Sequence, residues 1–202
     1  MSLPKTHKTG LILSYITVGY NVLEGIISII FGALAGSVAL IGFGADSFIE
    51  SLSGSVMIWR LRKHGKISEE EEERIEAKAA TLIGGTFFIL AAYIAFEAIK
   101  QLVSQEAPEA SLVGIVIAVL SLIVMPVLTY LKYTTGKAIN SPSLVADSKQ
   151  TLVCVLMSIA LLIGLGANYL FGIWWLDPVA GLVFVAILIK EGYVAIKYKD
   201  LC

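Results

Sequence analysis

Six apolar runs, each long enough to cross a lipid bilayer, dominate this sequence. They cover residues 10–34, 37–62, 79–103, 110–134, 143–169 and 178–197. A membrane-spanning helix needs roughly 20 predominantly apolar residues, and a bilayer offers no water to an unpaired backbone group, so such runs must be helical. The chain is 57% apolar, above the roughly 45–50% of soluble domains. The sequence therefore predicts an all-α membrane protein, with a single domain of six transmembrane helices in a bundle over residues 1–202.

The distribution of Lys and Arg predicts how this bundle is oriented. Short connections follow the first, third and fifth runs, whereas the longer ones, residues 63–78 and 132–142, lie on the other side. Of the 15 basic residues, 13 fall on the side of the longer connections and the termini, Lys132 among them. Only Lys100 and Lys149 fall elsewhere, near the opposite side and inside the fifth run. Because cytoplasmic loops are enriched in basic residues, we expect both termini to be cytoplasmic, in a multi-pass protein of the cell membrane.

Other classes of protein fit this sequence poorly. The first run is too long for a cleavable signal peptide, and Cys154 and Cys202 do not make a disulfide scaffold. The sequence has no strand pattern, phosphate-binding loop or basic patch for nucleic acid, so we expect no organic cofactor and no nucleic-acid partner. His7 and His64 lie outside the apolar runs, which leaves no Ser/His or Cys/His pair at membrane depth. An enzyme is therefore not expected.

Local signals predict two helix starts and one packing contact. Ser68 followed by Glu71 is a capping box, and acids suit a helix N-terminus, so residues 69–73 are interpreted as a solvated helical lead rather than a metal-binding loop. Asp177 before Pro178 predicts the N-cap and first position of the sixth helix. Gly32 and Gly36 form a small-xxx-small pair that is typical of helix packing.

Asp46 and Glu50 are the most informative polar residues in the apolar runs. Residues four apart lie on one helix face, so both carboxylates point into the same volume. An acid within a membrane helix is costly and normally marks an ion path or a proton relay. The alternative is a pair of protonated carboxyls bonded to neighbouring helices, but both would then have to be neutral or paired. The pair therefore predicts a cation site.

A polar stripe follows one face of the first run. Its members recur with the spacing i, i+4, i+7 and i+11: Thr17, Asn21, Glu24 and Ser28. Small polar side chains of this kind often bond between membrane helices. Asn21 and Glu24 are also candidates for a proton or ion relay. For Glu24, a neutral, hydrogen-bonded structural acid is the alternative.

The fifth run offers the other half of a cation site. Asp147, Gln150 and Cys154 lie at i, i+3 and i+7, on one helix face. Asp147 and Gln150 provide oxygen atoms, and Cys154 provides sulfur once it is deprotonated. The alternative for Cys154 is a small buried hydrophobe.

Three further charged residues are not expected to bind the ion. Lys149 points to another face of the fifth helix, where it either extends to the cytoplasmic edge or pairs with an acid. Glu97, close to Lys100, is expected at the outer edge of the bundle, and Glu191 at the cytoplasmic edge.

Three stretches resemble motifs of the cation diffusion facilitator family. Residues 37–40 (Ser-Val-Ala-Leu) and 45–50 (Ala-Asp-Ser-Phe-Ile-Glu) resemble the family's second-helix motif, in which a D/H-x-x-x-D pair binds the metal. Residues 146–154 resemble the fifth-helix motif, usually H-x-x-x-D, and residues 177–182 resemble the start of the sixth helix. The likeness covers essentially the whole chain.

The sequence departs from the family pattern in three places. Glu50 stands where the family usually has an aspartate, and Gln150 and Cys154 stand where it usually has histidine and aspartate. We also expect the chain to lack the family's ferredoxin-like C-terminal cytoplasmic domain.

The resemblance implies a homodimeric transporter that exports a divalent transition-metal cation, zinc or similar, from the cytoplasm. The metal is the substrate, and the hypothesised ligands are Asp46, Glu50, Cys154 and either Gln150 or Asp147, in an approximately tetrahedral site. Because carboxylate and thiolate ligands lose protons when they bind metal, exchange of the cation for protons is expected.

Two alternatives remain open at this point. A harder cation such as manganese, iron(II) or magnesium would be bound by oxygen alone, from Asp46, Glu50, Asp147 and Gln150. A membrane protein that binds metal to sense it or to modulate a partner, without transport, is the other alternative.

Overall fold

Six α-helices make up the described part of the protein, residues 5–63 and 68–198 of a computed structural model. Their bounds are α1 Lys5–Ala35, α2 Val38–Lys63, α3 Glu69–Ser104, α4 Leu112–Ala138, α5 Pro142–Phe171 and α6 Leu176–Tyr198. All the regular structure in these residues is helical, which confirms the all-α prediction. The predictions for His64, Lys66, Lys199 and Cys202 lie outside the described residues.

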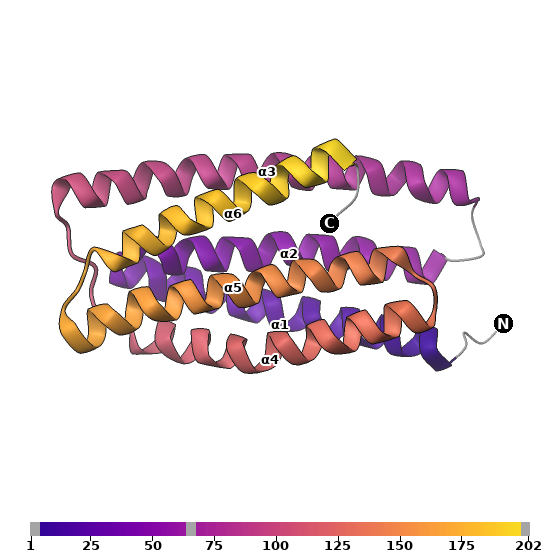
Figure 1. Ribbon diagram of the computed structural model, residues 1–202, viewed down its shortest axis with the longest axis horizontal. Helices are drawn as coiled ribbons and strands as arrows, with labels where there is room; N and C mark the ends of the chain where they lie inside the picture. The colour runs from indigo at the N-terminus through magenta and orange to yellow at the C-terminus, as the bar shows by residue number, and fades with distance from the viewer. Residues whose placement is uncertain (1–4, 64–67, 199–202) are drawn as a thin grey trace.

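The helices lie along one long axis, in two groups (Figure 1). The most extensive helix contacts join α1 with α2, α4 with α5, and α3 with α6. α3 and α6 form a pair along one side of the bundle, and the other four helices lie together beside them. α2 contacts α1, α3, α5 and α6, so it lies between the two groups.

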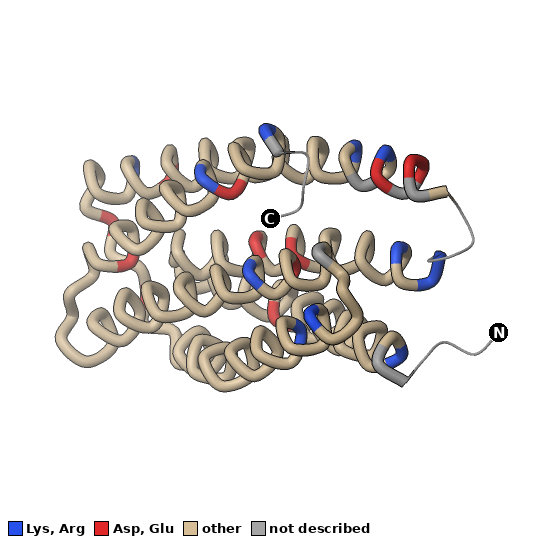
Figure 2. The backbone as a smooth tube through the Cα atoms, turned by 45° about the vertical axis from the view of Figure 1, so that its right-hand side comes forward, with Lys and Arg blue, Asp and Glu red and all other residues tan. Residues whose placement is uncertain are grey.

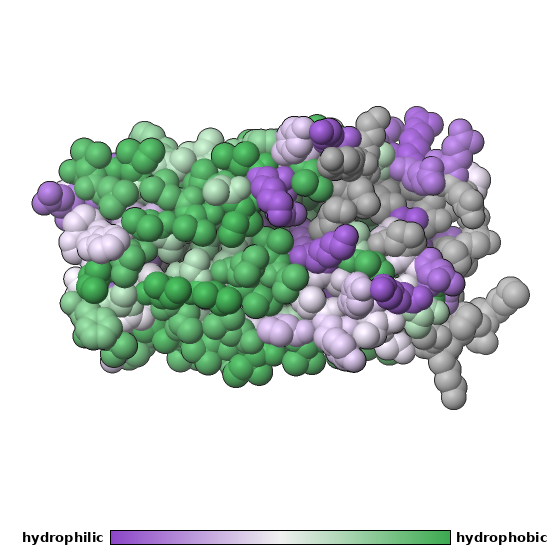
Figure 3. All heavy atoms as spheres, in the orientation of Figure 1, coloured by the Kyte–Doolittle hydropathy of each residue, from purple (hydrophilic) through white to green (hydrophobic). Residues whose placement is uncertain are grey.

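Five of the described helices are long and apolar enough to cross a membrane. They are His7–Ala35, Glu73–Ser104, Leu112–Ala138, Ser143–Phe171 and Leu176–Lys197. α2 falls short because its two acids, its serines and its glycines reduce its apolar character. More than half of the residues of α2 are buried against other helices. Its polar side chains therefore face protein, while apolar side chains cover much of the outer face of the bundle (Figure 3).

The predicted connections at one end of the bundle are correct, whereas one of the two longer connections predicted at the other end is wrong. Short links follow α1, α3 and α5, as expected. Ser68 caps α3 and accepts a hydrogen bond from the Glu71 backbone N–H at 3.3 Å, which confirms the N-cap half of the predicted capping box. The connection predicted over residues 132–142 is wrong, because α4 continues to Ala138 and α5 begins at Pro142.

Glycines allow α1 and α2 to approach closely. A Cβ atom on Gly25 would lie 2.9 Å from the Gly44 carbonyl oxygen, and one on Gly44 would lie 2.8 Å from the Cβ of Ser28. Gly32 packs in the same way against the backbone of α2, as predicted. The packing prediction for Gly36 is wrong: it has a positive φ of 65° and forms the turn between the helices, a conformation that glycine adopts without steric cost.

Asp177 does not cap its own helix, contrary to the sequence prediction. α6 already begins at Leu176, and the buried carboxylate of Asp177 is directed at the start of α2 instead. Ser37 Oγ donates to Asp177 Oδ1 (2.5 Å), and the Ala39 backbone N–H donates to Oδ2 (3.4 Å). The Leu40 N–H in turn donates to Ser37 Oγ (3.0 Å). A carboxylate from α6 thus satisfies the unpaired N-terminal donors of α2.

Replacing Asp177 with alanine should destabilise the bundle by about 1–3 kcal/mol, because buried donors of α2 lose their acceptor. The free energy of unfolding in detergent, measured by denaturant titration, checks this. Glu106→Ala is the matched control, since Glu106 is an exposed acid in the connection after α3. Equal stability of the two variants would contradict the capping role.

Candidate metal centre

The buried face of α2 carries the two carboxylates that the sequence singled out. Asp46 is 7% exposed and Glu50 is 2% exposed. Both acids lie in the interior of the bundle, and acidic residues occur about midway along its length (Figure 2). Asp46 and Glu50 thus define one buried region, called the acidic volume here, and two carboxyl groups on one buried face favour a cation.

The polar stripe of α1 faces this volume. Thr17, Asn21, Glu24 and Ser28 are all buried, which confirms that they share an interior face. Ser47 Oγ of α2 donates to Glu24 Oε2 at 2.8 Å, a contact that the close approach of α1 and α2 allows. Glu24 Oε1 and both amide atoms of Asn21 have no hydrogen-bond partner among the described residues. Unpaired buried polar atoms are costly and attract water or an ion.

A chain of polar contacts links Glu50 to α4 and α5. Thr151 Oγ1 donates to Glu50 Oε1 at 2.7 Å and accepts from the ammonium of Lys132 at 2.9 Å. The same ammonium forms an ion pair with Asp147 Oδ2 at 2.9 Å. Glu50 Oε2 has no partner among the described residues. Asp147 is therefore ion-paired through Oδ2 with a cation of the chain itself, while Asp147 Oδ1 and Glu50 Oε2 both lack a hydrogen-bond partner among the described residues.

Lys132 is the residue at which the sequence interpretation is most wrong. The sequence assigns it to the basic, loop-bearing side and leaves Lys149 as the basic residue inside a span. The structure shows Lys132 fully buried, at 0% exposure, whereas Lys149 is exposed on another face of α5, as its position in the helix predicted. One sequence signal points to this burial, since Lys132 falls within the predicted run 110–134. Only the ion pair with Asp147 of α5 identifies the lysine as buried between helices.

Gln150 and Cys154 are buried on the same face of α5 as Asp147, as their spacing predicted. Gln150 Oε1 has no hydrogen-bond partner in the described part of the chain. Cys154 is a free cysteine packed in the apolar core with Phe43 and Met157. Thr151, three residues earlier on the same helix, nevertheless contacts Glu50. The position of Cys154 suits both an apolar core residue and a residue at the edge of the acidic volume.

The structure does not gather the hypothesised ligands into a finished metal site. Within residues 5–63 and 68–198, no three His, Cys, Asp or Glu side chains lie close enough together to hold a metal ion. Besides Lys132, the sequence interpretation misses Thr151, which bridges α2 and α5. A lone threonine gives no sequence signal of a bridging role.

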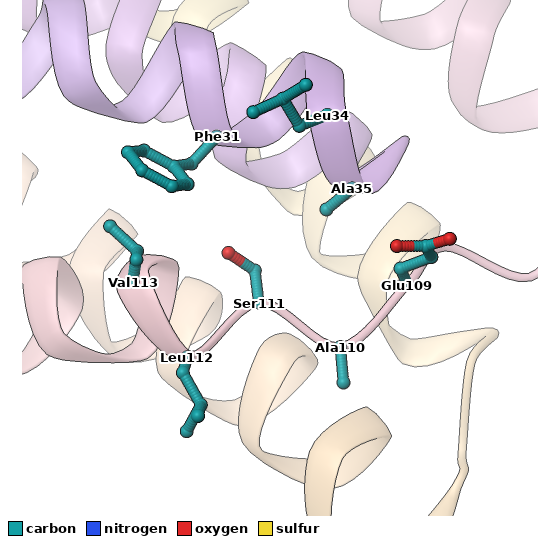
Figure 4. Close-up of a pocket in the computed structure, with 8 residues that line it drawn as sticks. All are labelled: Phe31, Leu34, Ala35, Glu109, Ala110, Ser111, Leu112 and Val113. Atoms are coloured by element: carbon teal, nitrogen blue, oxygen red, sulfur yellow. The ribbon is translucent and has the colours of Figure 1, made fainter.

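A cavity of 220 Å³ lies near the far end of α1, away from these residues (Figure 4). It is lined by the last turns of α1 and the segment that leads into α4: Phe31, Leu34, Ala35, Glu109, Ala110, Ser111, Leu112 and Val113. None of the predicted ligands lines it.

Comparison with known proteins decides the family. Residues 14–199 match the model of the cation efflux transmembrane domain. The chain belongs to the cation efflux family. This confirms the resemblance to cation diffusion facilitators, which are transporters and not enzymes, and makes the chain a multi-pass integral membrane protein with five candidate spans.

Individual relatives of this cation efflux protein are distant. An uncharacterized transporter of Methanocaldococcus jannaschii is 28% identical over 86% of this chain and 62% of its own length. An uncharacterized transporter of Synechocystis is 26% identical over 74% of this chain and 50% of its own length. A cadmium, cobalt and zinc/H⁺-K⁺ antiporter of Bacillus velezensis is 24% identical over 93% of this chain and 60% of its own length. The chain thus spans between one half and two thirds of the length of these relatives.

Proposed function

We propose that this cation efflux protein is a secondary transporter that exports a divalent transition-metal cation, zinc or a close relative, in exchange for protons. The observation that carries the proposal is the pair of buried carboxylates one helical turn apart on α2, with an unpaired oxygen on Glu50. A buried acid without a partner is costly unless a cation or proton occupies it. The similarity to the Bacillus velezensis antiporter supports a metal cation and protons as the exchanged ions.

The proposed ligands are Asp46 and Glu50 from α2 with Cys154 and Gln150 from α5. The ion pair between Asp147 and Lys132 favours Gln150 over Asp147 as the fourth ligand, because the charge of Asp147 is already balanced by an ammonium of the chain. Asp46, Glu50 and Cys154 do not lie close enough together to hold an ion in this structure, so binding requires α5 to move toward α2. Such a movement of one helix group against another is how secondary carriers alternate access to a central site.

The proposed membrane arrangement has all six helices crossing the bilayer as one domain, with both termini cytoplasmic. α2 crosses despite its polar content because four other helices shield it. Lys and Arg lie mainly toward the end of the bundle that carries the N-terminus (Figure 2), which the positive-inside rule assigns to the cytoplasm. We further propose a homodimer in the cell membrane, as the family resemblance implies.

The test is metal uptake into proteoliposomes with an imposed pH gradient. The purified protein should move Zn²⁺ or Co²⁺ into the lumen only when the lumen is more acidic than the outside. The lumen pH should rise as the metal enters, because protons leave in exchange. Saturable metal binding without any flux would overturn transport and favour a metal-binding protein that acts on a partner.

A harder divalent cation is the second candidate, and one observation favours it. The buried polar atoms without a hydrogen-bond partner around the acids are oxygens and one amide nitrogen, while the sulfur of Cys154 packs in the apolar core. They belong to Asn21, Glu24, Ser28, Glu50, Asp147 and Gln150. Oxygen ligands suit manganese or magnesium rather than zinc.

Cys154→Ser decides between the two candidates. If the sulfur binds the metal, the variant should lose affinity for Zn²⁺ and Cd²⁺ by about tenfold or more relative to Mn²⁺, because a soft ligand has become a hard one. A metal competition series on wild type and variant measures this. Unchanged selectivity would leave Cys154 as a core residue and support the harder cation.

A further inference from the structure

Lys132 brings a full positive charge to the candidate metal site from within the chain. Its side chain is fully buried between α4 and α5, and its ammonium lies 2.9 Å from both Asp147 Oδ2 and Thr151 Oγ1. Membership of the cation efflux family does not by itself assign a role to this lysine. A buried ammonium is expensive, and such a residue in a membrane helix calls for a functional explanation.

The contacts of Lys132 separate the acids of the site into two kinds. The ion pair through Oδ2 balances the charge of Asp147, and only its Oδ1 has no polar contact among the described residues. Glu50 does not touch the ammonium directly but receives the hydrogen of Thr151, whose oxygen accepts from Lys132. The lysine therefore acts on Glu50 through one hydroxyl group, and Lys132 also acts electrostatically on that carboxylate.

A fixed positive charge at this place has a definite effect on metal binding. It repels a divalent cation at Glu50, and in an interior of low dielectric this repulsion extends over several ångströms. It also balances the carboxylates when the metal is absent, so the empty site need not collapse or fill with another ion. A carrier benefits from both effects, since it must release its cargo as well as bind it.

We propose that Lys132 is a tethered cation that sets the affinity of the metal site: it withholds Asp147 from the ligand set and weakens binding of a divalent cation at Glu50. This proposal rests on the proposed function, because it presupposes that Asp46 and Glu50 bind the metal. Lys132 is a positioning residue, since it acts on the metal through its charge and through Thr151.

The experiment is a charge-pair cycle read out as Zn²⁺ and Co²⁺ affinity of the purified protein in detergent. Lys132→Met, which keeps an unbranched side chain one atom shorter, should bind at least about tenfold more tightly, because the repelling charge is gone. Asp147→Asn should bind at least about tenfold more weakly, because the released ammonium then turns wholly toward Glu50. The double variant should lie between the two single variants.

The opposite changes in metal affinity of the two single variants distinguish this role from a structural one, since loss of a merely structural ion pair would weaken binding in both. Lys149→Met is the matched control, because it removes the same charge from an exposed position two residues from Asp147, and it should leave affinity unchanged. Lys132→Arg, which retains the charge, should not tighten binding. If Lys132→Met does not fold, Asp147→Asn and the double variant decide, since the double variant leaves no unpaired buried charge.

Two results would overturn the proposal. The first is a folded Lys132→Met variant that binds no more tightly than wild type. The second is a double variant as weak as Asp147→Asn, which would make Asp147 a ligand. Failure of the proposed function looks different: wild type and Asp46→Asn would then bind alike. Wild-type binding that Asp46→Asn removes, with an unresponsive Lys132, would reject only the role of the lysine.

Discussion

Asp46→Asn should reduce metal flux by about 100-fold or more while the protein still folds. Removing even an outer-shell partner of a metal ligand typically costs 10–100-fold in affinity, and this change removes a charged ligand itself. Asparagine has nearly the shape of aspartate, so the packing of α2 is preserved. It also replaces a buried acid by a neutral amide, so the free energy of unfolding should stay equal or rise.

Flux is measured as proton-driven Co²⁺ or Zn²⁺ uptake into proteoliposomes, and folding by gel filtration and thermal unfolding in detergent. Glu97→Gln is the matched control, because Glu97 lies on α3 and pairs with Lys100 at 3.3 Å, outside the acidic volume. It should transport at the wild-type rate. Undiminished flux through folded Asp46→Asn would remove Asp46 from the site and with it the proposed ligand set.

Gly44→Val should destabilise the protein by about 1–3 kcal/mol and impair transport as well. A Cβ atom on Gly44 would lie 2.8–2.9 Å from the Cβ of Ser28, the carbonyl oxygen of Gly25 and a side-chain carbon of Ile29. Two of these three atoms belong to backbone or to a Cβ that cannot rotate away, so α1 and α2 must separate, which is costly in a packed core. The separation would also lengthen the contact between Ser47 and Glu24.

Denaturant titration in detergent measures the loss of stability. Gly19→Val is the control, because a Cβ atom on Gly19 meets nothing within 4 Å and the residue is exposed on α1. Replacing a helical glycine there should be neutral or slightly stabilising. The close approach of α1 and α2 would be refuted if Gly44→Val were as stable as Gly19→Val.

Helical periodicity accounts for what could be predicted of the site. The face shared by Asp46 and Glu50, the stripe through Asn21 and Glu24, and the face through Gln150 all depend only on the pitch of a single helix. These residues are buried, as their patterns indicated. The helix count followed in the same way from the length of each apolar run.

Contacts between residues on different helices could not be predicted from the pitch of a single helix. Lys132 and Asp147 are 15 positions apart, on different helices, and nothing local to either residue indicates the ion pair between them. Asp177 had a complete local explanation as the cap of its own helix, and yet it caps α2, 138 residues away from its contact at Ala39. In both cases a charged side chain pairs with the polar group that the fold brings nearest.

The sequence by itself determined that this protein is a bundle of helices with two acids on one interior face. The length of each apolar run predicts a helix, and the helical period places Asp46 and Glu50 on one face. Only the tertiary structure decided which acids are already neutralised. An unpaired buried charge is costly, so the groups that the fold places beside each carboxylate decide whether its charge is balanced. Asp147 pairs with Lys132, Glu50 accepts from Thr151, which also bonds to Lys132, and Asp46 is buried one turn from Glu50.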